Sequence, residues 1–127
     1  MSKKIIAVAG ATGAQGGGLV RSILADPQGE FAVRALTRDP ASPAAQALAL
    51  AGAEVVAADI SDPVAVARAF AGAYGAYCVT FFWNHFSPER ERAEARGLAD
   101  AARSAGLQHV VWSTLEDTRL QVPLNDL

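Results

Sequence analysis

The sequence contains almost no cysteine, little lysine and no excess of positive charge. Among 127 residues there are one cysteine and two lysines, and the formal net charge is −2. A single cysteine excludes a disulfide framework within the chain. Because no basic run extends beyond Lys3 and Lys4, we expect no binding of nucleic acid by bulk charge.

Long apolar runs are also missing. No stretch of about 20 apolar residues is present that could span a membrane, and the glycines that interrupt the first apolar stretch do not fit a secretory signal. We therefore expect a cytoplasmic protein without a membrane segment. A hydrophobic fraction of 51% and a charged fraction of 19% predict one globular domain over residues 1–127, long enough to bury a core.

Glycine is concentrated in one place, directly after the apolar run 5–9, where Gly10, Gly13 and Gly16 are spaced three apart. Gly10 can adopt backbone angles closed to other residues, Gly13 lets the main chain approach a pyrophosphate, and Gly16 allows the next helix to pack closely. That helix would direct its unpaired N–H groups at the phosphates. Such turns also serve as plain corners, but the flanking strand and apolar helix face favour dinucleotide binding.

Strand and helix patterns alternate along the chain. The predicted strands cover residues 4–8, 31–36, 54–58, 76–80 and 109–113, and the predicted helices cover 17–24, 43–50, 63–70 and 88–105. This order with short loops predicts an α/β fold of the Rossmann type, a doubly wound parallel sheet with helices on both faces. The expected strand order is 3-2-1-4-5, which places a ligand across the carboxyl ends of the strands.

The carboxyl end of the second strand carries Arg38. A site selective for NAD usually offers a carboxylate here to the ribose 2′-hydroxyl, whereas a guanidinium binds the 2′-phosphate of NADP. The alternative is an exposed arginine paired with Asp39. We favour the phosphate, so NADP is the expected cofactor and NAD the second choice.

The third strand is followed by Asp59 and Ile60. Asp59 could accept a hydrogen bond from the adenine amino group while Ile60 covers a face of the ring. The alternative is that Asp59 caps the next helix, although Ser61 or Asp62 suits that position better.

The fourth strand leads into a dense group of aromatic residues within 81–86. Three arrangements are compatible with it: a wall beside the nicotinamide with Thr80 and Phe81 nearest the cofactor, a surface for a neighbouring subunit, or a small core beneath the long helix. His85 in this loop has no partner at metal-ligand spacing, so no metal site is predicted. A general-base role for His85 stays open.

The sequence lacks a Tyr-x-x-x-Lys pair, in which the charge of the lysine lowers the pKa of the tyrosine so that it can act as a proton donor. Tyr74 and Tyr77 are followed at the fourth position by Cys78 and Phe81. Ser113, at the end of the fifth strand, lies where this fold class often places a hydroxyl near the reacting carbon. A hydroxyl alone is insufficient, so no catalytic residue is assigned, and Cys78 is expected to be a buried strand thiol.

Several blocks together resemble the NmrA-like family of atypical short-chain dehydrogenases. They are residues 10–17 (GATGAQGG), 36–40 (LTRDP), 52–56 (GAEVV), 58–59 (AD) and 110–116 (VVWSTLE), with Asn84 after an aromatic run. The match covers almost the whole chain. It implies a Rossmann-type domain that binds NADP.

The resemblance implies a role for each matching position. The loop residues Gly10, Thr12, Gly13, Ala14, Gln15 and Gly16 would bind the pyrophosphate, with contacts from Thr12 and Gln15 among them. Arg38 would bind the 2′-phosphate. Asp59 and Ile60 would contact the adenine, and Thr80 and Phe81 would lie toward the nicotinamide.

The chain departs from the family pattern in two ways. Family members often carry basic residues soon after the arginine, whereas residues 41–44 here are Ala-Ser-Pro-Ala, which weakens the preference for NADP. Family members are also considerably longer, and their later part supplies a substrate-facing lobe and a lysine near the nicotinamide. We therefore expect this chain to correspond to the cofactor-binding portion.

Three functions are compatible with these observations. The first is a redox sensor or regulatory dinucleotide-binding module. The second is an NAD(P)H-dependent oxidoreductase of quinones or small carbonyl compounds whose substrate lobe is missing from this chain. The third is an interaction protein, in which the aromatic loop and the edge of the fifth strand pair with a second copy or with a partner protein.

Overall fold

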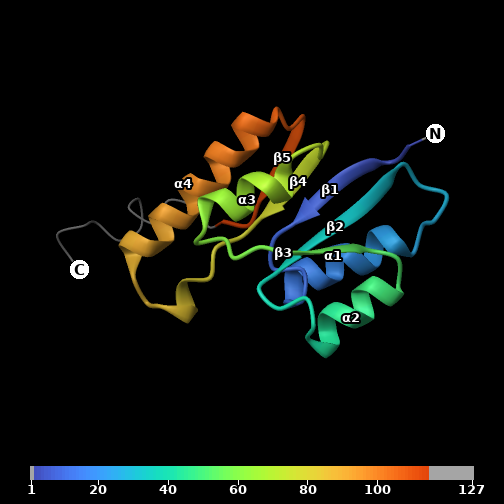
Figure 1. Cartoon of the computed structure of the whole chain (residues 1–127), viewed down its shortest axis with the longest axis horizontal. Coiled ribbons are helices and arrows are strands. Elements are labelled where there is room, and N and C mark those ends of the chain that lie inside the picture. The colour runs from blue at the N-terminus through green and yellow to red at the C-terminus, as the bar shows by residue number, and fades with distance from the viewer. Residues whose placement is uncertain (1, 115–127) are drawn as a thin grey trace, which may run out of the picture.

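The structure is a computed structural model, and the residues it describes are 2–114. It contains one five-stranded parallel sheet with helices on both faces (Figure 1). The strand order is β3-β2-β1-β4-β5. The fold class and the strand order predicted from the sequence are therefore confirmed. Among residues 2–114, no helix combines the length and the hydropathy that a membrane span requires.

Strands and helices follow one another in strict alternation. The strands are β1 (Lys4–Val8), β2 (Phe31–Thr37), β3 (Glu54–Ala57), β4 (Gly75–Cys78) and β5 (His109–Trp112). The helices are α1 (Ala14–Leu24), α2 (Pro43–Leu50), α3 (Pro63–Phe70) and α4 (Pro88–Ala105), and a short 3-10 helix, η1 (Phe82–Asn84), precedes α4.

The sheet separates two hydrophobic cores. Helices α1 and α2 cover one face of the sheet, and α3 and α4 cover the other (Figure 1). Phe70 and Leu98 are fully buried in the core beneath α3 and α4, and Val8 and Val20 are fully buried in the core beneath α1 and α2. Burying apolar faces on both sides is what a central parallel sheet requires, so strand β1 is held between two helical layers.

Helix α1 begins earlier than the sequence suggested. Its first residue is Ala14, not Gly17, and Gly13 is the N-cap with an extended backbone. The Gly17 N–H donates to the Gly13 carbonyl at 2.8 Å, which closes the first helical turn through the glycine-rich run. Glycine in the interior of a helix is destabilising, so the glycine-rich sequence predicted a helix that starts about one turn too late.

Candidate functional site

The turn between β1 and α1 depends on two glycines. Gly10 has a φ of +61°, in the left-handed region. A Cβ atom added at Gly16 would lie 2.2 Å from the Gly10 carbonyl oxygen, so only glycine allows α1 to start this close to the end of β1. The roles predicted for these two residues, an unusual backbone conformation and close packing, match the geometry.

Helix α1 starts without the side-chain cap that the three other α-helices of residues 2–114 possess. Ser42, Asp62 and Ser87 cap α2, α3 and α4 with side-chain oxygens, whereas Gly13 provides no side-chain hydrogen bond to α1. The first N–H groups of a helix have no partner within the helix. The amino terminus of α1 therefore presents backbone donors and a positive dipole end to an external anion.

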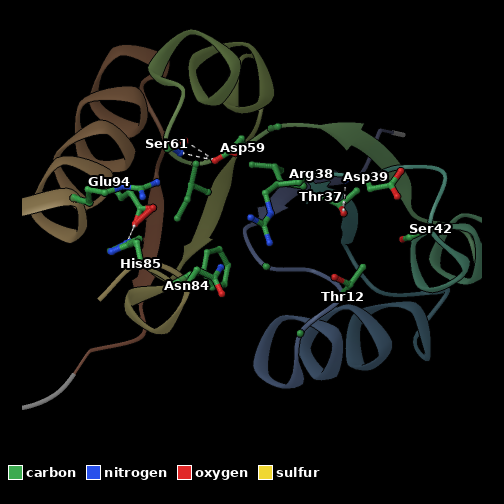
Figure 2. A pocket seen from close by; sticks show the side chains of 17 residues that line it. Thr12, Thr37, Arg38, Asp39, Ser42, Asp59, Ser61, Asn84, His85 and Glu94 are labelled. Atoms are coloured by element: carbon green, nitrogen blue, oxygen red, sulfur yellow. Dashed lines mark hydrogen bonds and ion pairs between the residues drawn. The ribbon is translucent and has the colours of Figure 1, made fainter. Parts of the chain in front are cut away.

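A cleft of about 370 Å³ opens beside this helix end, at the carboxyl edge of β1, β2 and β3. Figure 2 shows Arg38 extending from the end of β2 into the cleft, with Asp59 and Thr12 on either side of it. The cleft is lined by Gly10, Thr12, Gly13, Leu36, Thr37, Arg38, Asp39, Ser42, Ala58, Asp59, Ile60, Ser61, Phe81, Asn84, His85, Arg90 and Glu94. Of the predicted site residues, seven are in this lining: Gly10, Thr12, Gly13, Arg38, Asp59, Ile60 and Phe81.

Arg38 is exposed and makes no ion pair with Asp39 within residues 2–114. The Asp39 carboxylate instead accepts a hydrogen bond from the Ala41 N–H at 3.0 Å. The alternative of an Arg38–Asp39 pair is therefore wrong in this structure. The guanidinium of Arg38 faces the cleft with its donors available.

Asp59 forms a local turn at the start of α3. Its Oδ1 accepts hydrogen bonds from the Ser61 N–H at 2.9 Å and the Ser61 hydroxyl at 2.7 Å. These bonds hold the pKa of Asp59 below its ordinary value, and the positive charges of Arg38 and Arg90 lower it further. Asp62 is the residue that caps α3, so Asp59 is an ionised acceptor on the cleft wall and not a helix cap.

Four predicted site residues lie outside the cleft lining: Ala14, Gln15, Gly16 and Thr80. The Oε1 atom of Gln15 accepts hydrogen bonds from the hydroxyls of Tyr77 and Ser113, the latter at 2.7 Å. The Thr80 hydroxyl donates to Glu91 of α4 at 2.8 Å. Gln15 therefore lies over the ends of β4 and β5, beside the cleft, and Thr80 ties the aromatic loop to α4.

His85 and Glu94 form a buried pair in the wall of the cleft (Figure 2). Their side chains are 4% and 7% exposed, and His85 Nε2 lies 2.9 Å from Glu94 Oε1. Since the Ser87 N–H donates to His85 Nδ1 at 3.0 Å, the proton of the neutral imidazole resides on Nε2 and is donated to the carboxylate. Sequence reasoning missed this partner of His85, because nine positions separate the two residues across a loop.

The aromatic loop divides into a half-buried and an exposed part. The ring of Phe81 packs so closely on Gly10 that a Cβ there would lie 2.8 Å from it. Trp83 and Phe86 are 76% and 66% exposed, and their ring centroids lie 5.6 Å apart in an edge-to-face arrangement. Phe86 has a φ of +56°, which lies in the left-handed region and is a strained conformation for a bulky residue. Phe81 thus borders the cleft, whereas the other two rings form an exposed patch.

The sequence model of the NmrA-like family matches residues 2–124. The chain belongs to the NmrA-like family. It is 42% identical over 114 residues to the NmrA-like family domain-containing oxidoreductase FrzB of Cladobotryum sp, which covers 87% of this chain and 33% of that protein. The same identity and coverage apply to the oxidoreductase hkm9 of Aspergillus hancockii. The chain thus spans about one third of the length of these curated NmrA-like relatives.

Solved structures show the same fold around dinucleotides. The negative transcriptional regulator NmrA in complex with NADP is 29% identical, with a TM-score of 0.80 over 97% of this chain and 37% of that chain. NmrA in complex with NAD gives a TM-score of 0.80 at 30% identity, with the same coverage. The Citrobacter sp. triphenylmethane reductase complexed with NADP(H) gives a TM-score of 0.70 at 31% identity, over 88% of this chain and 36% of that chain.

Proposed function

We propose that this chain is the NADP(H)-binding part of an NmrA-like protein. One observation carries the proposal: the uncapped amino terminus of α1 and the unpaired guanidinium of Arg38 face the same cleft. A helix amino terminus attracts the pyrophosphate, and a guanidinium attracts the extra phosphate of NADP. The solved NmrA and triphenylmethane reductase complexes with NADP support it.

The residues of the cleft fit such a cofactor. Gly13 and the first turn of α1 would bind the pyrophosphate, because no side chain caps the first N–H groups of this helix and Gly13 lines the cleft. Ile60 would cover a face of the adenine ring. The ionised carboxylate of Asp59 would accept a hydrogen bond from the adenine amino group. When bound, the cofactor supplies a hydride donor or acceptor.

The regulatory function is our first choice. A redox sensor needs only to distinguish cofactor states by binding, and the cleft provides binding groups without an assigned proton donor. The structurally similar NmrA is a negative transcriptional regulator, which supports this choice. The second candidate is an NAD(P)H-dependent oxidoreductase of quinones or small carbonyl compounds, favoured because the curated relatives are named oxidoreductases.

A titration and a turnover assay separate the two candidates. Isothermal titration with NADP, NADPH and NAD measures binding, and NADPH oxidation is followed by absorbance with a panel of quinones and carbonyl compounds. Binding without oxidation supports the regulatory function, whereas oxidation with any acceptor supports the enzyme. If none of the three nucleotides binds, the proposal fails.

Two further expectations belong to the same proposal. The exposed rings of Trp83 and Phe86 and the outer strand β5 are surfaces suited to a second copy or a partner protein. A cytoplasmic location stays a prediction.

A further inference from the structure

The adenosine end of a bound NADP would meet an unusual distribution of positive charge. Between Arg38 and Arg68 the sequence contains no lysine or arginine. The loop from β2 to α2 therefore provides one cation for the 2′-phosphate. A doubly charged phosphate group is bound more strongly by two charge-assisted contacts than by one, so a cation from another element would strengthen its binding.

The opposite wall of the cleft supplies that cation. Arg90 lies in the first turn of α4 and lines the same cleft as Arg38. Its backbone N–H donates to the capping hydroxyl of Ser87 at 3.2 Å, which fixes where this residue leaves the helix. Arg90 therefore lines the cleft from α4, whereas Arg38 lines it from the end of β2.

The charges around the two arginines leave them available to a ligand. Each carboxylate in the cleft lining is bound locally: Asp39 by Ala41, Asp59 by Ser61 and Glu94 by His85. Within residues 2–114, neither arginine side chain has a hydrogen bond or an ion pair to the protein. The positive charges of both arginines lower the pKa of Asp59, so both guanidinium groups act on this part of the cleft.

We propose that Arg90 is a specificity-determining residue, which binds the 2′-phosphate of NADP from the side of the cleft opposite Arg38. This inference rests on the proposed function. In the sequence, Arg90 belongs to the charged stretch 89–92 at the start of a long helix, a pattern typical of a solvated face. Only its place in the cleft distinguishes it from the other arginines of α4.

The experiment compares Arg38→Gln, Arg90→Gln and the control Arg96→Gln in the 127-residue chain. Arg96 lies on the same helix but lines a groove between α3 and α4, so the control removes the same charge away from the cleft. Titrations use NADP and NAD, and also 2′,5′-ADP and 5′-AMP, which carry the adenosine end alone. Thermal unfolding of each variant checks that the fold is intact.

We expect Arg90→Gln to lower the affinity for NADP and 2′,5′-ADP about tenfold, since loss of one charge-assisted contact costs about a factor of ten in affinity. The affinities for NAD and 5′-AMP should stay within about twofold. Arg96→Gln should bind like the original chain. Equal losses for NADP and NAD would indicate an adenine contact and overturn the inference. The inference is also overturned if Arg38→Gln loses affinity for NADP while Arg90→Gln keeps the affinity of the original chain. If the original chain binds neither nucleotide, the proposed function itself fails.

Discussion

The hydroxyl of Ser113, just after β5, donates a hydrogen bond of 2.7 Å to Oε1 of Gln15 at the start of α1. The Tyr77 hydroxyl donates to the same oxygen. Two donors on one amide oxygen fix the orientation of the amide, so its NH₂ group points away from both hydroxyls. Gln15 therefore connects the turn between β1 and α1 to the ends of β4 and β5, and within residues 2–114 no hydrogen bond is recorded for its NH₂ group.

This orientation predicts that Gln15→Glu binds NADP less tightly than Gln15→Ala does. A glutamate can accept both hydroxyl hydrogen bonds, but it adds a negative charge where the pyrophosphate is expected to bind. The same charge favours the helix amino terminus, so the free energy of unfolding should not fall. Calorimetric titration with NADP, together with urea unfolding, measures both quantities. Equal affinity of the two variants would show that Gln15 does not face the pyrophosphate.

The second prediction concerns the packing of α1 on the turn. In Gly16→Ala the new methyl group would meet the backbone of Gly10, at 2.2 Å from its carbonyl oxygen. We expect the free energy of unfolding to fall by about 2 kcal/mol or more, because backbone atoms cannot move aside as a flexible side chain can. Urea unfolding followed by circular dichroism provides the measurement.

Gly18→Ala is the matched control for this substitution. An added Cβ at Gly18 has no atom nearer than the Arg21 guanidinium, at 3.9 Å. Since alanine is the better helix former, this variant should be more stable by about 0.5–1 kcal/mol. Similar destabilisation of both variants would contradict the specific role of Gly16.

Much of the fold and part of the site could be predicted from the sequence, because both depend on local patterns. The boundaries of α4 and the strand order follow from apolar periodicity, caps and short connections. Gly10, Gly16 and Arg38 were found because each is tied to one position of a turn or strand end. All three are placed where those patterns predicted them.

The missed features depend on contacts between distant segments. The partners of Gln15 lie on β4 and beyond β5, and they meet α1 only because β4 lies next to β1. Arg90 reaches the cleft through the rotation of α4 about its axis, which the many charged residues at the start of this helix do not reveal. Local sequence patterns carry no information on either relationship.

The third prediction concerns the buried pair of His85 and Glu94. Replacing His85 with alanine would leave the carboxylate of Glu94, which is 7% exposed, without its partner. Removal of one member of a buried pair costs about 3 kcal/mol of stability. His109→Ala is the control, because this second histidine is exposed on β5 and its loss should change stability by less than about 0.5 kcal/mol. Equal unfolding midpoints in urea for the two variants would be inconsistent with the pair.

The fourth prediction concerns the edge of the sheet. Val111 and Trp112 are 47% and 37% exposed on β5, one of the two outer strands of the sheet formed by residues 2–114. Because an exposed apolar edge pairs readily with another chain, we expect sedimentation velocity to show self-association that grows with concentration. Val111→Lys should reduce it, whereas Leu50→Lys on α2, where Leu50 is 90% exposed, should not. A monodisperse monomer at every concentration would refute this expectation.

The last prediction concerns Cys78, which is fully buried in the core beneath α3 and α4. Burial raises the pKa of its thiol from 9.0 to about 11, because the thiolate cannot be solvated there. The folded chain should therefore resist alkylation by iodoacetamide at pH 8 and react only when unfolded, as a mass increase of one adduct would show.

The same pKa shift fixes the sign of a pH dependence. Above pH 9 the unfolded chain loses its thiol proton while the folded chain keeps it, so the unfolded state binds fewer protons and is favoured as pH rises. The stabilising contribution is fully present below pH 9 and is lost as pH rises toward about 11. Urea unfolding at pH 8, 9, 10 and 11 should show this decline, and a Cys78→Ala variant should lack the part due to the thiol. If the decline is identical in both chains, the thiol is not buried as the structure describes.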